Sequence, residues 1–146
     1  MNKENSVDKK EEENLKKAIT ELTVKLDQRT LVIWATDCAE HVLSYFEEKH
    51  PKDDRPRKAI EAGRAWLHGK LSVGEVRTAA LAAHAAAREV EEGITRAVAR
   101  AAGQAASTAH IAGHAIHAAN YAAKVSTNER IWQNKHLLDL VKKNKK

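Results

Sequence analysis

Residues 94–125 read ITRAVARAAGQAASTAHIAGHAIHAANYAAKV, and this stretch decides the fold. Alanine, glycine, isoleucine or valine cover most sides of a helix drawn through it, and a helix of that kind belongs inside a bundle. Because alanine is small, neighbouring helix axes approach to the short end of the usual ~8–10 Å range. The stretch therefore predicts one long central helix, about 48 Å in length, inside a compact alanine-rich helical bundle.

The rest of the composition also favours helices. The chain has 146 residues, enough for one domain, and only 4% of its residues are aromatic although 42% are hydrophobic, because alanine supplies most of the apolar count. With 6 glycines and 2 prolines there is little material for tight turns. We therefore expect an all-α fold of five to six helices joined by short connections.

Helical periodicity places the expected elements along the chain. We expect helices over residues 7–26, 28–49, 56–68, 72–93 and 94–125, and a last helix within 127–146. Three regions follow from this: a polar N-terminal arm or peripheral helix (1–27), a helical domain (28–126), and a C-terminal helix with a basic tail (127–146).

Two of these helices carry clear packing signals. In residues 28–49, Trp34, Cys38 and Val42 belong to one continuous apolar arc that faces the core. In residues 56–68, Gly63 lies on the apolar stripe although glycine costs roughly 1 kcal/mol against alanine inside a helix. We therefore expect another backbone to approach closely at Gly63.

The segment HPKDDRPR, residues 50–57, joins two of these helices and has two readings. In the first it is structural: Asp53 or Asp54 accepts hydrogen bonds from the free N–H groups of the next helix, and Pro56 fits that helix's first turn. In the second, its charges form a corner that recognises a partner. The candidate residues of this charged corner are Asp54, Arg55 and Arg57.

A line of residues runs along the alanine-rich stretch at alternating spacings of three and four. Its members are Gly103, Ser107, His110, His114, His117 and Tyr121. Such spacings fall on one side of a helix, so these residues form one seam. The seam has three readings: a polar face bonded to water or backbone, an interface with a partner or a second copy of the chain, and a metal site on His110 and His114.

Residues 72–93 carry a second candidate stripe. Its members are Arg77, Leu81, His84, Arg88 and Glu91. A histidine flanked by arginines is a poor metal ligand, because the neighbouring cations oppose a bound cation. We therefore expect His84 to be a boundary or interface residue.

The motifs of the common enzyme classes are missing from the sequence. It has no GxSxG, no phosphate-binding loop, no GxGxxG, no HExxH and no CxxC. A metal on His110 and His114 needs at least one further ligand from another helix. We expect a protein that binds rather than catalyses and that uses no cofactor. The alternative is a metal-binding or hydrolytic helical bundle that uses His110 and His114.

Charge and cysteine content bear on partners and location. The net charge of +5 favours an acidic partner, but the basic residues are interleaved with Asp and Glu and aromatics are few, which disfavours nucleic acid. The single cysteine, Cys38, fits a reducing cytosol. Neither a signal peptide nor an apolar run of ~20 residues is seen. We expect a cytoplasmic protein with no membrane partner.

Three segments resemble a known family. They are CAEHVLSYFEEKHPKDDRPRKAIEAGRAWLHGKLS, AALAAHAAARE and ARAAGQAASTAHIAGHAIHAANYAAK, all within residues 31–125. Together they are similar to the putative immunity protein family, the domain named for its resemblance to immunity protein five. His117 departs from the family pattern, which has a small residue at this position.

The resemblance implies an all-helical bacterial domain on the immunity side of toxin–immunity systems. It gives motif positions without chemical roles, at Cys38, Glu40, Asp54, Arg55, Pro56, Trp66, His84, Arg88, His110, His114 and Tyr121. We therefore expect a non-catalytic protein that neutralises a cognate protein toxin by direct contact. The candidate partner-binding residues are Asp54, Arg55, Arg57, His84, Arg88, His110, His114, His117 and Tyr121. A homodimer whose interface is the seam stays open beside this reading.

Overall fold

The computed structural model of the protein describes residues 8–144. This part of the chain forms eight helices and no strand: α1 (Lys9–Thr23), α2 (Gln28–Val42), α3 (Ser44–Glu47), α4 (Arg55–Leu67), α5 (Val73–Arg88), α6 (Ile94–Ser107), α7 (His114–Ala122) and α8 (Glu129–Asn144). The all-α class is confirmed, while the expected number of five to six helices is too low. The beginning of the expected arm (1–7) and the end of the basic tail (145–146) lie outside the described residues.

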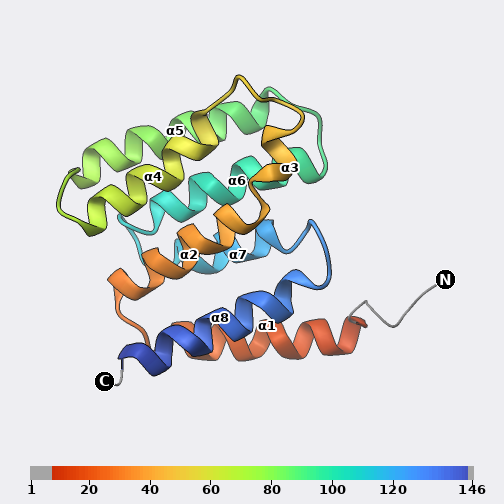
Figure 1. Ribbon diagram of the computed structural model, residues 1–146. Helices are drawn as coiled ribbons and strands as arrows, with labels where there is room; N and C mark the ends of the chain where they lie inside the picture. The colour runs from red at the N-terminus through yellow and green to blue at the C-terminus, as the bar shows by residue number, and fades with distance from the viewer. Residues whose placement is uncertain (1–7, 145–146) are drawn as a thin grey trace.

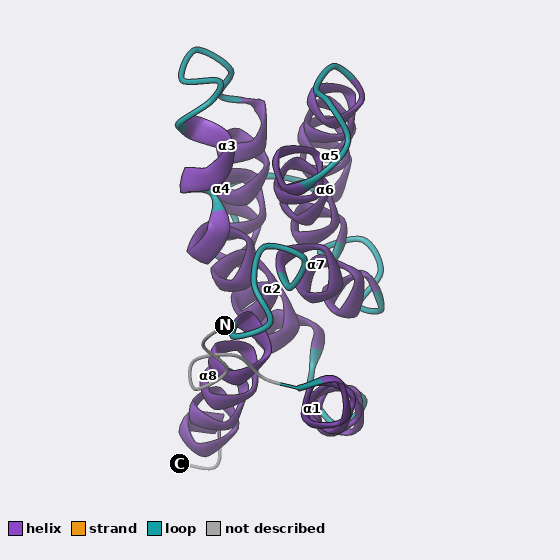
Figure 2. Cartoon of the chain, turned by 90° about the vertical axis from the view of Figure 1, so that its right-hand side faces the viewer, coloured by secondary structure: helices purple, strands orange, loops and turns teal. Residues whose placement is uncertain are grey.

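The helices are stacked side by side, with α6 near the centre of the stack. In Figure 1, α5 lies at the top with α4 and α6 below it, α2 and α7 follow, and α1 with α8 form the lower part. From the side, in Figure 2, α4, α2 and α8 form one column and α5, α6, α7 and α1 the other. α6 packs against α2, α3, α4, α5 and α7, whereas α1 packs mainly on α8. None of the helices described is both long and apolar enough to cross a membrane.

Alanine makes up most of the core around α6. Between Ala97 and Ala106, every residue of α6 is buried except Arg100 and Gln104, so this helix is enclosed on nearly all sides. Small side chains make this possible, because they let several neighbouring helices approach one helix at once.

Gly63 of α4 lies where α4 packs against both α2 and α6. A Cβ added at Gly63 would lie 3.0 Å from Cγ2 of Thr36 in α2 and 3.8 Å from the Cα of Ala106 in α6. The expectation that another backbone approaches closely at Gly63 is therefore confirmed.

Local caps set the helix starts. Asp27 accepts a hydrogen bond from the backbone N–H of Thr30 at the start of α2 (2.8 Å). Ser72 and Glu75 form a reciprocal capping box, so α5 starts where the sequence predicts a helix to begin. That helix ends at Arg88, earlier than expected, and Gly93, with a φ of 125°, instead begins α6 in a conformation that favours glycine.

The expected single helix over residues 94–125 is wrong. The chain forms α6 and α7 instead, with a turn at residues 108–113 between them, and α7 folds back to pack on α6. Both α6 and α7 are apolar on most sides. Hydrophobic periodicity therefore does not distinguish two short packed helices from one long one.

Hydrogen bonds from outside the helix explain why α6 ends where it does. Gln28 of α2 donates from Nε2 to the backbone carbonyls of Thr108 (3.0 Å) and Ala109 (2.9 Å). Ser107 Oγ also donates back to the carbonyl of Gly103 (2.9 Å), a local bond that competes with helix continuation. The partner that sets this turn is thus about 80 residues away in the sequence.

Buried polar groups fasten α8 to the rest of the bundle. Trp34 of α2 donates from Nε1 to the backbone carbonyl of Gln133 (3.0 Å), and Gln133 donates from Nε2 to the carbonyl of Ala119 in α7 (2.8 Å). Both donor side chains are fully buried, where a polar group without a partner costs free energy. α8 is thereby linked to both α2 and α7.

Replacing Gln28 by alanine removes both hydrogen bonds to the turn. We expect the free energy of unfolding to fall by about 1–2 kcal/mol, although alanine has the higher helix propensity, because two carbonyls lose their donor. Urea denaturation followed by circular dichroism measures the loss. Lys25→Ala, at an exposed position nearby, is the control and should change stability by less than about 0.5 kcal/mol. An unchanged midpoint for Gln28→Ala would show that another interaction ends α6.

Candidate functional site

The seam is not straight, but its residues still gather on one side of the bundle. His110 lies in the turn between α6 and α7, while His114, His117 and Tyr121 lie on α7. His114 donates from Nδ1 to Oε1 of Gln104 in α6 (2.7 Å), and the ring centroids of His114 and His117 are 6.1 Å apart. The fold-back of α7 therefore sets the histidines against α6.

The side chain of His84, on α5, contacts α6 on the side opposite to α7. Its ring lies over Gly103 so closely that a Cβ there would be 2.6 Å from His84 Cε1. Arg100 donates from NH1 to Nδ1 of His84 (3.2 Å), which requires a neutral imidazole with a lone pair on that nitrogen. The missing side chain of Gly103 thus makes the room that His84 fills.

These residues form one surface, which we call the basic face. It consists of His84 and Arg88 on α5, Arg100 and Gln104 on α6, His110 in the turn, and His114, His117, Tyr121 and Lys124 on and after α7. The two stripes that the sequence placed on separate helices therefore share one surface.

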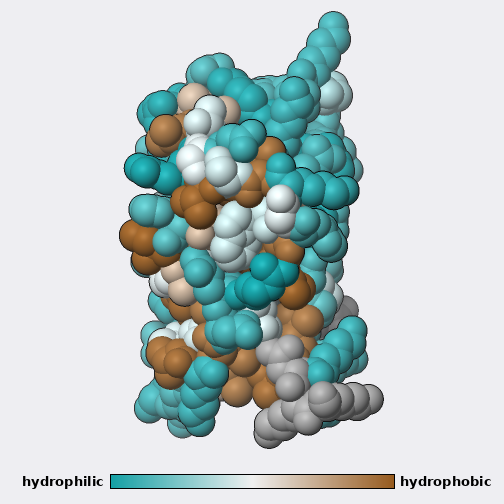
Figure 3. Space-filling view, turned by 90° about the vertical axis from the view of Figure 1, so that its left-hand side faces the viewer, coloured by the Kyte–Doolittle hydropathy of each residue, from teal (hydrophilic) through white to brown (hydrophobic). Residues whose placement is uncertain are grey.

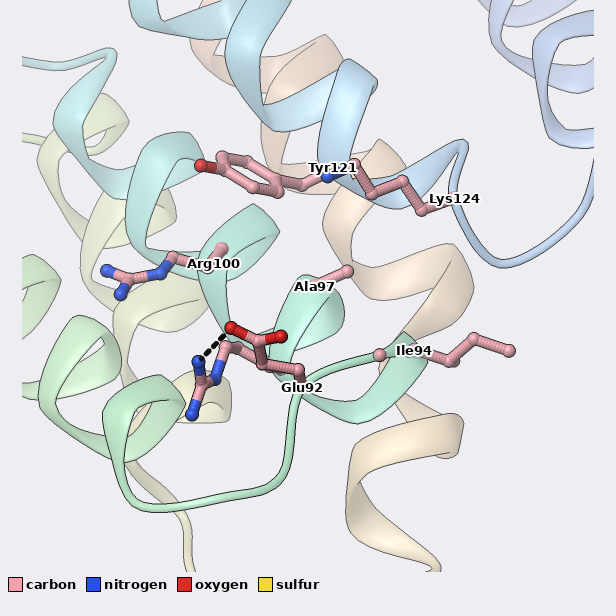
Figure 4. A pocket seen from close by; sticks show the side chains of 8 residues that line it. Glu92, Ile94, Ala97, Arg100, Tyr121 and Lys124 are labelled. Carbon is pink, nitrogen blue, oxygen red and sulfur yellow. Dashed lines mark hydrogen bonds and ion pairs between the residues drawn. The ribbon is translucent and has the colours of Figure 1, made fainter.

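A cleft of about 510 Å³ opens at one end of the basic face, between α6, α7 and the connection before α6. Figure 4 shows the side chain of Tyr121 reaching from α7 across toward α6, with Arg100 and Lys124 on opposite sides of it. Lys124 Nζ lies 5.1 Å from the centroid of the Tyr121 ring, a cation–π contact. Arg96 is bonded to a carbonyl near the end of α5 (2.9 Å) and paired with Glu92 (3.4 Å). The cleft therefore presents two cations around a tyrosine.

The imidazoles of the basic face have cations as neighbours. Burial lowers the pKa of His84 below its ordinary value, and the guanidinium groups of Arg100 and Arg88 lower this pKa further. Burial also lowers the pKa of His114, and His117 adds to the effect. A carboxylate beside these rings would act in the opposite direction, because it stabilises the protonated form.

The charged corner lies elsewhere, at the connection between α3 and α4. Arg55 binds Asp53 (2.7 Å) and Glu89 just after α5 (2.9 Å). Asp53 also accepts from the backbone N–H of Arg55 (3.1 Å), and these bonds hold the pKa of Asp53 below its ordinary value. Arg55 thus fastens the corner to the end of α5.

The other two predicted residues of the corner are also bonded within the chain. Arg57 makes two hydrogen bonds to the carboxylate of Glu47 in α3, at 2.6 and 2.7 Å. Asp54 does not cap the start of α4 with its side chain and instead pairs with Lys58 (3.1 Å). The structure therefore does not bring Asp54, Arg55 and Arg57 onto the basic face.

Sequence reasoning missed three members of the basic face. Arg100 lies three residues before Gly103 and Lys124 three residues after Tyr121, so the spacing of the seam continues through both. Extending the seam by one step at each end would have found them. Gln104 lies four residues after Arg100 and three before Ser107, so it falls on the same side of α6, and the fold-back of α7 brings His114 to it.

The residues present offer little to a metal. Within residues 8–144, no group of three or more His, Cys, Asp or Glu side chains is arranged to hold a metal ion. A zinc site needs at least three protein ligands, so His110 and His114 are too few. Cys38 is fully buried, and burial raises the pKa of its thiol well above the ordinary value, so it stays protonated and unreactive.

Comparison with known families shows to which family the chain belongs. The sequence model of a family described as "Imm-5 like putative immunity protein" matches residues 21–140, most of the chain. The chain belongs to this family. The match runs from the end of α1 into α8, so this Imm-5 like region includes both the basic face and the charged corner. The resemblance carried by the motifs is thereby confirmed. No curated protein and no solved structure matches the chain.

Gly103→Ala tests how the basic face is packed. The new Cβ would lie 2.6–2.9 Å from three ring atoms of His84, so the ring must move. We expect a loss of about 1–3 kcal/mol in the free energy of unfolding and altered NMR signals of the His84 ring.

Gly113→Ala is the matched control. A Cβ at Gly113 meets nothing within 4 Å and its φ is −60°, so alanine fits there. We expect stability to be equal or higher, by up to about 1 kcal/mol. Unchanged His84 signals in Gly103→Ala would contradict the packing described here.

Proposed function

We propose that this Imm-5 like protein neutralises a cognate bacterial toxin by direct protein–protein contact, without catalysis, and that the basic face is the contact surface. The observation behind the proposal is that two predicted interface stripes, from α5 and from the α6–α7 hairpin, converge on one surface. The family description supports a toxin as the partner.

Large apolar side chains are exposed beside the basic face. Leu81, one helical turn before His84 on α5, is 67% exposed, and Ile111, next to His110, is 53% exposed. Figure 3 shows the end of the molecule that holds the α6–α7 turn, where apolar patches are interspersed with hydrophilic surface. Protein interfaces commonly combine apolar anchors with tyrosine and arginine, so the composition of this surface fits a binding role.

The surroundings of His84 on the basic face support contact rather than turnover. A histidine that acts as general base is commonly oriented by a carboxylate, which also stabilises its protonated form. His84 is instead held by Arg100, and burial lowers its pKa. Such a ring is a weak base but a good hydrogen-bonding group for a partner.

A different protein suits the basic face better than a second copy of this chain. A twofold homodimer through this face would bring the same surface of both copies together. The arginine and lysine side chains of the two copies would then face each other, and like charges across an interface cost free energy. We further propose that the complex forms in the cytoplasm, where a single cysteine stays reduced.

Leu81→Asp tests the contact surface without disturbing the core. We expect affinity for the cognate toxin domain to fall by about tenfold or more, because a charge replaces an apolar anchor. Titration calorimetry gives the affinity, and co-expression with the toxin shows whether protection is lost.

Val24→Asp is the matched control, since Val24 is 78% exposed at the end of α1, in the lower part of the stack in Figure 1. We expect the Val24→Asp variant to bind the toxin domain with wild-type affinity and to protect cells from the toxin as the wild type does. Equal affinity for both variants would remove the basic face as the contact surface. A wild-type chain that forms no complex with the toxin domain would overturn direct neutralisation.

A further inference from the structure

The basic face differs from the rest of the surface in how its charges are paired. Arg55, Arg57 and Arg64 each bind carboxylates within the chain, at 2.6–2.9 Å. Arg100, by contrast, donates to the imidazole of His84. Its guanidinium has five N–H donors, so most of its hydrogen-bonding capacity is left for another partner.

The groups around the two half-buried rings of the basic face, His84 and His114, come from every neighbouring element. They are Arg88 from α5, Arg100 from α6, His110 from the α6–α7 turn, and His117 from α7, and the two rings also act on each other. All of these groups are positive or become positive on protonation. The surface therefore gathers positive charge without the counter-charge that Arg55, Arg57 and Arg64 have.

Two carboxylates in the connection before α6 are engaged within the chain. Glu92 pairs with Arg96 at the edge of the cleft (3.4 Å), and Glu89 is bound by Arg55 at the corner (2.9 Å). Neither carboxylate contacts Arg100, which donates to His84, so the remaining donors of Arg100 can bind a carboxylate from another molecule.

We infer that the toxin segment bound by the basic face is acidic, and that its carboxylates enter the cleft beside Arg100, Tyr121 and Lys124. This inference rests on the proposed function and adds the chemistry of the partner. Guanidinium, ammonium and phenol groups all donate to carboxylates, and the bonds from the two cations are charge-assisted and therefore strong. The cleft has these three donors, from α6, from α7 and from the turn after α7, with Tyr121 between the two cations (Figure 4).

Docking of a carboxylate is coupled to proton uptake. A carboxylate bound by Arg100 lies near His84, which Arg100 contacts, and its negative charge raises the pKa of His84, which burial and Arg100 lower in the free protein. At a given pH the complex then holds more protons than the free protein, so affinity must rise as the pH falls from about 8 to about 6. Glutamate stays ionised over this range because its ordinary pKa is about 4.3. Protonation of His84 also releases Arg100, since the protonated ring no longer accepts its hydrogen bond.

A synthetic peptide tests the inference without the toxin. The folded full-length chain is titrated with a short glutamate-rich peptide and with the same peptide carrying glutamine in place of glutamate. We expect binding of the glutamate peptide only, several-fold tighter near pH 6 than near pH 8. Calorimetry in two buffers of different ionisation enthalpy should show net proton uptake.

Three charge-neutralising variants locate the site. Arg100→Gln and Lys124→Gln should each weaken binding of the glutamate peptide by about fivefold to tenfold. Lys135→Gln removes the same charge from an exposed position on α8 and should weaken it by less than about twofold. If Arg100→Gln folds poorly, peptide binding by Lys124→Gln tests the site alone, because Lys124 is exposed.

The outcomes separate the two proposals. Equal binding of both peptides, no pH dependence, or an equal effect of Lys135→Gln overturns the acidic partner. A toxin complex that forms through the basic face without proton uptake also overturns it, and leaves the proposed function intact. Tight, pH-dependent binding of the glutamate peptide by a chain that forms no toxin complex supports the acidic ligand and overturns the proposed function alone.

Discussion

Five other helices pack against α6 because its buried positions are almost all alanine and glycine, which let each neighbour approach closely. α5 lies on one side of α6 and α7 on the other. The ring of His84 fills the space above Gly103, and His114 reaches Gln104. Larger side chains on α6 would push these neighbours outward and separate the histidines. The basic face thus depends on small residues that are not themselves part of the contact surface.

Charged side chains serve two different purposes in this molecule. At the periphery they hold elements together, as where Arg55 joins the α3–α4 connection to the end of α5 and Arg64 binds Asp37 and Glu40 of α2. On the basic face the cations lie beside imidazoles, and burial and positive neighbours both oppose protonation. The peripheral ion pairs stabilise the free protein. The cations of the basic face are stabilised only when a partner brings negative charge.

The sequence predicted features that depend on nearby residues. The helical class, the start of α5 at Ser72 and the close approach at Gly63 follow from composition, caps and the apolar stripe, and the structure has all three. It did not predict the break between α6 and α7, because the donor that ends α6, Gln28, is about 80 residues away. For the same reason spacing alone did not show that His84 and the seam meet, since that contact depends on how α5 and α7 pack around α6.

Hydrogen exchange in the complex with the toxin domain, compared with the free protein, tests the central claim most directly. That claim is that the surface assembled around α6, and not the charged corner, contacts the partner. We predict slower exchange of the backbone amides in residues 108–122 and at the end of α5, with no change in residues 49–57 or in α1. Slowing confined to residues 49–57, or to α1 and α8, would contradict the account.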